Sequence, residues 1–183
     1  AMRLHVSYHA PMTDKKFYGL MGNASSFLKD LTLLETSNHG WTEKYLDPKT
    51  GKHWLKYMID RDNGRYFNLM LLTTKPTTDE IIDIAFTSTD YDEVEGASHR
   101  LFIDEEDEKI DFRPAVIERL KKIYISKLDT EAKKRVKAII LNGHLTDKTN
   151  KREIVGKHFS EIQKDVDFFN EIADFATQIL KQL

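Results

Sequence analysis

The chain has 183 residues, of which 28 are basic and 30 are acidic, so its formal net charge is −2. This length predicts one domain, and without cysteine the chain can form neither disulfide bonds nor a thiolate metal site or nucleophile. Because no segment holds the roughly 18–20 consecutive apolar residues that span a bilayer and no signal peptide is evident, we expect a cytoplasmic protein without membrane contact.

The first part of the chain mixes two hydrophobic patterns. Residues 3–8 alternate between apolar and polar side chains, which is the pattern of a half-buried strand. Apolar side chains then follow a helical spacing from residue 13 to residue 34, with an interruption at Gly22-Asn23. We therefore expect one strand followed by two helical segments.

The next block predicts an antiparallel meander. Turn sequences at residues 47–51 and 62–64 separate three strand-like runs, and the second turn contains Asn-Gly, a strong hairpin signal. The last run is apolar on both faces, so we expect it to be a central, covered strand. The predicted strands occupy residues 42–46, 53–59 and 65–74.

After Pro76 the pattern is helical to the end of the chain. Thr77 and Glu80 form a capping-box sequence, and Asp129 is the expected N-cap of a later helix. From Asn150 an uninterrupted apolar spacing predicts one long C-terminal helix. That helix either packs along the body of the domain or forms the seam of a homodimer.

These elements predict an α+β fold in a single domain covering residues 1–183. Residues 1–75 form an N-terminal antiparallel β-meander with two helices, and residues 76–183 form a helical half that ends in one long helix. Within this half, residues 79–102 resemble one HEAT or armadillo-like helix pair, because an apolar first helix ends at a short turn before a second apolar stripe. Nothing repeats at a period near 40 residues, so a regular solenoid is not expected.

The charge is distributed unevenly along the chain. Residues 1–75 carry 11 basic and 7 acidic side chains, residues 76–113 carry 3 and 13, and residues 114–183 carry 14 and 10. Carboxylates gathered in this way either solvate a helix end or form a surface that steers a basic partner into contact. The candidate partner-binding residues are Asp90, Asp92, Glu93, Glu95, Asp104, Glu105, Glu106, Asp107 and Glu108.

An acidic surface of this kind predicts a non-catalytic protein-binding module with a basic protein as its partner, such as a toxin or a nuclease. Nucleic acid itself would be repelled there by its phosphates. In type, the chain resembles bacterial immunity proteins that neutralise toxins, which are small, poor in cysteine, acidic on one face and without catalytic motifs. A likeness of this kind implies a function without establishing it.

Catalytic and metal-binding motifs are not evident in the sequence. His5 and His9 lie on one face of the first predicted strand, but about 13 Å separates residues four apart in a strand, too far to share one ion. Residues 60–64 begin like a calcium loop, but the glycine comes too early and the closing Glu is missing. We therefore expect no metal, no cofactor and no catalytic residue.

Two alternative functions remain open. The first is a single-stranded nucleic-acid-binding or adaptor protein that stacks bases on the meander, where Trp54, Tyr57 and Tyr66 lie among basic residues. The second is an enzyme with an unrecognised polar pocket. The basic residues of the meander are Lys44, Lys49, Lys52, Lys56, Arg61 and Arg65.

Overall fold

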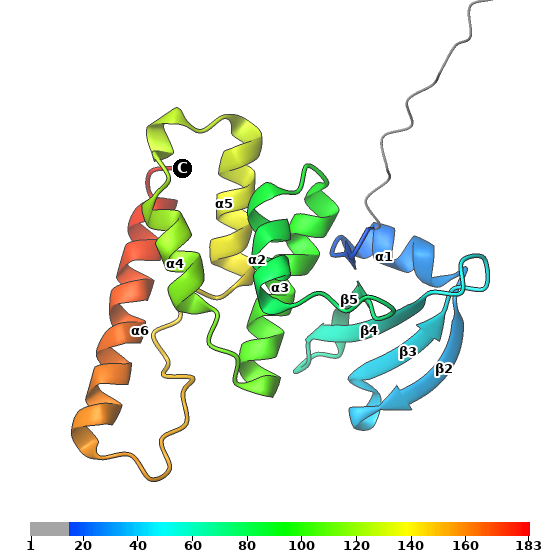
Figure 1. Ribbon diagram of the computed structural model, residues 1–183, viewed down its shortest axis with the longest axis horizontal. Coiled ribbons are helices and arrows are strands. Elements are labelled where there is room, and N and C mark those ends of the chain that lie inside the picture. The colour runs from blue at the N-terminus through cyan, green and yellow to red at the C-terminus, as the bar shows by residue number, and fades with distance from the viewer. Residues whose placement is uncertain (1–14) are drawn as a thin grey trace, which may run out of the picture.

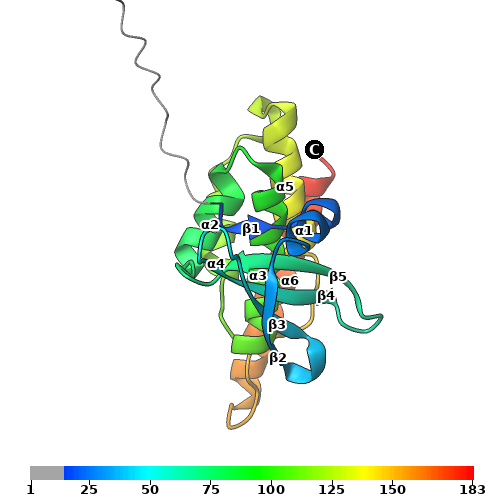
Figure 2. The same ribbon diagram turned by 90° about the vertical axis from the view of Figure 1, so that its right-hand side faces the viewer.

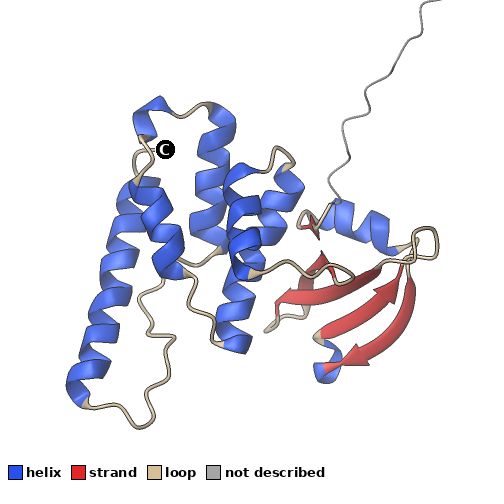
Figure 3. Cartoon of the chain, viewed as in Figure 1, coloured by secondary structure: helices blue, strands red, loops and turns tan. Residues whose placement is uncertain are grey.

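The computed structural model describes residues 15–183, and in it the strands gather on one side of the molecule and most helices on the other (Figures 1 and 3). The strands are β1 (Phe17–Tyr18), β2 (Thr32–Ser37), β3 (Thr42–Leu46), β4 (His53–Asp60) and β5 (Arg65–Leu71). The α-helices are α1 (Met21–Leu28), α2 (Thr78–Thr87), α3 (Tyr91–Glu108), α4 (Arg113–Lys121), α5 (Thr130–Asn142) and α6 (Phe159–Leu180). Two short 3₁₀ turns, Asn38–Gly40 and Ile125–Lys127, complete the described elements.

The five strands form one antiparallel sheet in the order β1-β5-β4-β3-β2. The predicted meander is therefore confirmed for the three strands after residue 41. Its first turn is closed by Asp47, whose carboxylate accepts hydrogen bonds from the Lys49 N–H and the Thr50 hydroxyl at 2.9 and 2.7 Å. Residues 68–71 of β5 are buried, which agrees with the expected central strand.

Helices cover both faces of the sheet. Because side chains alternate along a strand, Trp54 and Tyr57 of β4 point to opposite faces. On one face, α1 brings Phe27 against Trp54 and Tyr18 in an aromatic cluster, with ring centroids 4.4–5.4 Å apart. On the other face, the Tyr57 hydroxyl donates to the Gly96 carbonyl of α3 at 3.3 Å. In Figure 2 the sheet is the part of the molecule nearest to the viewer, and the helical half lies behind it.

The helical half is built around α3, which packs against β1, α2 and α5. The capping box of Thr77 and Glu80 begins α2 and the N-cap Asp129 begins α5, both as expected, and Asp90 is the N-cap of α3. α6 lies along α4 and α5 and buries Phe169, Ile172 and Ala176 among other apolar side chains. The predicted α+β class and the long C-terminal helix are thus confirmed.

The predicted helical region from residue 13 to residue 34 is wrong in most of its length. Phe17 and Tyr18 pair with β5 as a short strand, and residues 32–37 pair with β3. The helix that does form, α1, runs through Gly22-Asn23, the predicted break. The spacing of the apolar residues wrongly predicted a helix, because Leu33 and Leu34 lie on an edge strand, where they are 51% and 52% exposed. The strand predicted at residues 3–8 lies outside the described residues.

The C-terminal helix begins later than predicted. The Asn150 side chain accepts a hydrogen bond from the Arg152 N–H at 2.9 Å, which makes a local turn instead of a helix N-cap. Gly156 has φ +80, which a right-handed helix cannot contain. A capping box of His158 and Glu161 then begins α6, so residues 148–158 form a loop.

Candidate protein-interaction site

Most carboxylates of the acidic segment, residues 76–113, are neutralised inside the molecule. Nine of its thirteen acidic residues form an ion pair with a basic side chain of the described chain. The pairs join Asp83 with Arg119, Asp90 and Asp92 with Lys15, Asp104 with Arg100, Glu105 with Arg113, Glu106 with Lys151, Asp107 with Arg61, Glu108 with Lys75 and Arg100, and Asp111 with Arg152. The basic flanks of the sequence therefore fold back onto its acidic middle.

Some of these ion pairs are buried between helices. The Arg113 guanidinium is fully buried and donates to both Glu105 oxygens at 2.6 and 2.8 Å, a bidentate geometry. Arg100 pairs with Asp104 one turn further along α3, and only 6% of each side chain is exposed. Burial raises the pKa of Asp104 above its ordinary value, against the opposite effect of Arg100. The Glu105–Arg113 pair therefore joins α3 to α4, whereas the Arg100–Asp104 pair lies within α3.

Asp92 has a separate structural role at the junction of the two halves. Its carboxylate accepts hydrogen bonds from the backbone N–H groups of Gly19 and Leu20 at 2.9 and 2.6 Å, just before α1. Its other oxygen lies 2.7 Å from the Lys15 ammonium. Asp92 is only 2% exposed, so this carboxylate fastens the β1–α1 connection to the first turn of α3.

The structure therefore corrects part of the predicted partner-binding set. Asp92, Asp104 and Glu105 are buried, so a partner cannot reach them in this fold. Glu106, Asp107 and Glu108 lie in the last turns of α3, where their basic neighbours from other parts of the chain already neutralise them. Asp90, Glu93 and Glu95 remain at least partly accessible near the start of α3.

Four carboxylates of the segment form no ion pair within residues 15–183: Asp79, Glu80, Glu93 and Glu95. The first three lie near one another, because the N-terminal half of α2 and the first turn of α3 flank the same hollow. Glu80 and Glu93 line this hollow, and Asp79 precedes Glu80 in α2. The uncompensated negative charge of the segment is thus concentrated at the α2–α3 hollow.

The α2–α3 hollow has a volume of about 470 Å³ and combines acidic and apolar walls. Pro76 and Ile84 supply apolar surface, and Glu80, Asp83 and Glu93 supply carboxylates. The Asp83 side chain is 60% exposed even though it pairs with Arg119 at 2.5 Å. Lys16, the one cation in the lining, extends its ammonium to the Thr74 hydroxyl at 2.6 Å.

Local hydrogen bonds fix the two unpaired carboxylates of the hollow. Glu93 accepts from the Lys16 backbone N–H at 2.6 Å and from the Ser88 hydroxyl at 3.1 Å. Glu80 accepts from the Thr77 N–H at 2.7 Å, which lowers the pKa of Glu80 below its ordinary value and keeps it ionised at neutral pH. Two negative charges are therefore held in fixed positions beside an apolar surface, a combination that suits the stem and head of a lysine or arginine side chain.

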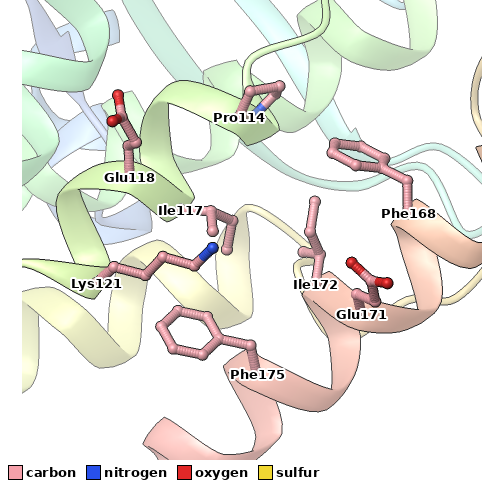
Figure 4. A pocket seen from close by; sticks show the side chains of 8 residues that line it. All are labelled: Pro114, Ile117, Glu118, Lys121, Phe168, Glu171, Ile172 and Phe175. Carbon is pink, nitrogen blue, oxygen red and sulfur yellow. The ribbon is translucent and has the colours of Figure 1, made fainter.

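A second hollow lies between α4 and α6 and is more apolar (Figure 4). Ile117, Phe168, Ile172 and Phe175 line its volume of about 320 Å³. The Lys121 ammonium lies 6.0 Å from the centre of the Phe175 ring, and Glu118 and Glu171 are its acidic lining residues. Charge is not concentrated here, so the α2–α3 hollow remains the candidate site.

The meander does not present the predicted base-stacking surface. Trp54 and Tyr57 are only 4% and 0% exposed, because both faces of β4 are covered, and only Tyr66 is largely exposed. Four of the six basic residues there pair with acidic neighbours within the chain: Lys44 with Glu35, Lys49 with Asp30, Lys56 with Glu43 and Arg61 with Asp107. The prediction of a nucleic-acid site on the meander is therefore wrong in its aromatic part.

The described residues hold no constellation for metal chemistry: between residues 15 and 183 no three histidine or carboxylate side chains could hold a metal ion. His5 and His9 lie outside this range. In the α2–α3 hollow the Ser88 hydroxyl contacts Glu93, but it also bonds to the Asp90 backbone in the turn that begins α3. This serine therefore stabilises the turn before α3.

Acid should destabilise the fold by protonating the carboxylates of its ion pairs. Hydrogen bonds, mainly from Arg61 and from Lys157 respectively, lower the pKa values of Asp107 and Asp165. A carboxylate with a lowered folded-state pKa stabilises the fold above its unfolded-state pKa, and this contribution is lost as the pH falls through the folded-state pKa. Urea unfolding across about pH 5 to pH 2 should show a falling free energy of unfolding, and the fall should be shallower in Asp107→Asn/Asp165→Asn. An equal slope in the two proteins would contradict this assignment.

Comparison with known proteins finds no matching family model, no matching curated protein and no matching solved structure. None of the helices in the part of the chain that the structure describes is long and apolar enough to cross a membrane. The function of the chain must therefore be inferred from its own geometry.

Proposed function

We propose that this chain is a non-catalytic protein-binding module that recognises a basic protein through the α2–α3 hollow. The observation that carries the proposal is the position of the unpaired carboxylates. Of the four acidic side chains in residues 76–113 that form no ion pair within residues 15–183, Glu80 and Glu93 line this one hollow together with the exposed Asp83, and Asp79 precedes Glu80 in α2. The lining holds three carboxylates and one cation, Lys16, so a basic partner supplies further compensating charge.

The lining of the hollow fits a lysine or arginine side chain of the partner. Its methylene stem packs against Pro76 and Ile84, and its charged head reaches Glu80 and Glu93. Because backbone and hydroxyl donors already hold Glu93 in place, little side-chain entropy is lost on binding. A toxin or nuclease with a basic surface is a partner of this chemistry, in keeping with the resemblance in type to immunity proteins.

The test is affinity capture with three versions of the immobilised chain. The first is the wild type, the second carries Asp79→Lys/Asp83→Lys at the hollow, and the third carries Asp167→Lys/Asp174→Lys on the exposed face of α6. The two variants change the net charge equally, and circular dichroism checks that each is folded. We expect a basic protein to be retained in stoichiometric amount by the wild type and the α6 variant, and to bind the hollow variant at least about tenfold more weakly.

Two outcomes would overturn the proposal. One is a wild-type chain that retains no protein in stoichiometric amount at low salt. The other is a retained partner whose affinity is equal for the hollow variant and the α6 variant, since this would locate binding elsewhere. A homodimer through α6 stays a separate prediction, and sedimentation of the purified wild type tests it.

A further inference from the structure

A strongly basic segment joins α4 to α5 and is not part of the proposed protein site. Residues 119–137 carry eight basic and only two acidic side chains. They occupy the last turn of α4, the 3₁₀ turn Ile125–Lys127 and the first half of α5. The Lys133 ammonium donates to the carbonyl of Leu183 at 3.3 Å, so the end of α6 meets the same end of the helical half. We call Lys122, Tyr124, Lys127, Lys133 and Lys181 the basic end.

The charges of the basic end differ from those of the acidic segment because they are not neutralised. None of its four lysines forms an ion pair with an acidic side chain within residues 15–183, although Lys133 contacts the Leu183 oxygen. The nearby acids are otherwise engaged: Asp129 caps α5 through the Ala132 N–H at 2.7 Å, and Glu131 pairs with Lys134. Arg119, at the start of this segment, pairs with Asp83.

Helix electrostatics explain only part of this arrangement. Lys122 follows the last turn of α4, where a cation interacts favourably with the helix dipole. Lys133 lies instead in the first turn of α5, where the same dipole disfavours a positive charge. Lys133 contacts the Leu183 oxygen, whereas Lys122, Lys127 and Lys181 are exposed and form a surface that attracts an anionic ligand.

One aromatic side chain indicates which anionic ligand fits. Tyr124 is 73% exposed and lies within this lysine-rich segment. The Lys127 ammonium lies 5.1 Å from the centre of its ring, so the ring is flanked by positive charge. Exposed aromatic rings among lysines are how proteins bind single strands, because a base stacks on the ring while the cations contact the phosphates. An acidic protein surface would use the lysines but not the ring.

We propose that the basic end binds single-stranded nucleic acid, with a base stacked on Tyr124 and phosphates contacted by Lys122, Lys127 and Lys133. This activity is separate from the proposed binding of a basic protein, and either can fail without the other. The test is the fluorescence anisotropy of a labelled twelve-nucleotide poly-U RNA, titrated with the full chain at 50 and 200 mM salt. The variants are Tyr124→Ala, Tyr124→Phe, Lys122→Glu/Lys127→Glu and the control Lys148→Glu/Lys164→Glu, whose lysines are exposed outside the basic end.

The expected results separate stacking from charge. Tyr124→Ala should weaken binding about tenfold or more, while Tyr124→Phe should keep it, because the ring supplies the stacking. Lys122→Glu/Lys127→Glu should weaken binding further and flatten the dependence of log affinity on log salt by about 1–2, and the control should bind as the wild type does. Three results would each overturn the proposal: no binding by the wild type at 50 mM salt, equal losses in the control, or full affinity in Tyr124→Ala, which would show that no base stacks on the ring.

Discussion

Replacing Glu105 with leucine is expected to lower the free energy of unfolding by about 3–5 kcal/mol, because the change leaves a buried guanidinium without its counter-charge. Arg113 is fully buried, and the Glu105 carboxylate is its one anionic partner among the described residues. The guanidinium also lies near the rings of Phe112 and Phe169, 5.8 and 4.8 Å from its carbon, which stabilise a cation far less than a carboxylate does. Urea unfolding followed by circular dichroism measures the loss.

The matched control replaces both partners of this ion pair. Glu105→Leu/Arg113→Met fills the same space with apolar side chains, and we expect its stability to be close to that of the wild type. Such a result would show that the single variant suffers from an unpaired charge and not from altered packing between α3 and α4. A double variant as unstable as Glu105→Leu would contradict that explanation.

A second large effect is expected at the contact between β1 and α3. A Cβ atom added at Gly19 would lie 2.0 Å from the Gly96 backbone nitrogen and 2.6 Å from its Cα. Backbone atoms of a buried helix cannot yield as a flexible side chain does, so Gly19→Ala must push β1 away from α3. We expect a loss of about 3 kcal/mol or more, at the upper end of what overpacking costs, measured as a fall in the urea midpoint.

Gly22 provides the control for this substitution. It lies within α1, and a Cβ atom added there would meet nothing within 4 Å. Gly22→Ala should therefore raise stability slightly, by roughly 0.5–1 kcal/mol, because alanine favours a helix over glycine. If Gly19→Ala were as stable as Gly22→Ala, the close approach of β1 to α3 would not be a feature of the folded protein.

The elements that could be predicted from the sequence are those determined by residues close together in the chain. The turn at Asp47, the capping box at Thr77 and the N-caps Asp90 and Asp129 depend on residues within a few positions of each other. The order of strands and helices after residue 41 follows from such signals. The edge strand at residues 32–37 does not, because its leucines imitate a helical spacing and only its pairing with β3 makes it a strand.

The ion pairs of the acidic segment could not be predicted either, because most of their partners lie far away in the sequence. Lys15 is 75 residues from Asp90, and Arg61 is 46 residues from Asp107, so these pairs exist only after folding. Only the i,i+4 pair of Arg100 and Asp104 carries a local signal. The structure therefore places the candidate surface at the beginning of α3 instead of at its end. There Glu93 lines the same hollow as Glu80 of α2, which the sequence suggested only as part of a capping box.

Zero-length carbodiimide cross-linking of the captured complex tests the central claim most directly, because it joins carboxylates of this chain to lysines of its partner. Digestion and mass spectrometry then identify which carboxylates reacted. We predict cross-links from Asp79, Glu80, Asp83 or Glu93 at the α2–α3 hollow, and none from Asp107 or Glu108 at the other end of α3. Cross-links confined to Asp107 and Glu108, or to carboxylates of α6, would show that the partner binds a different surface.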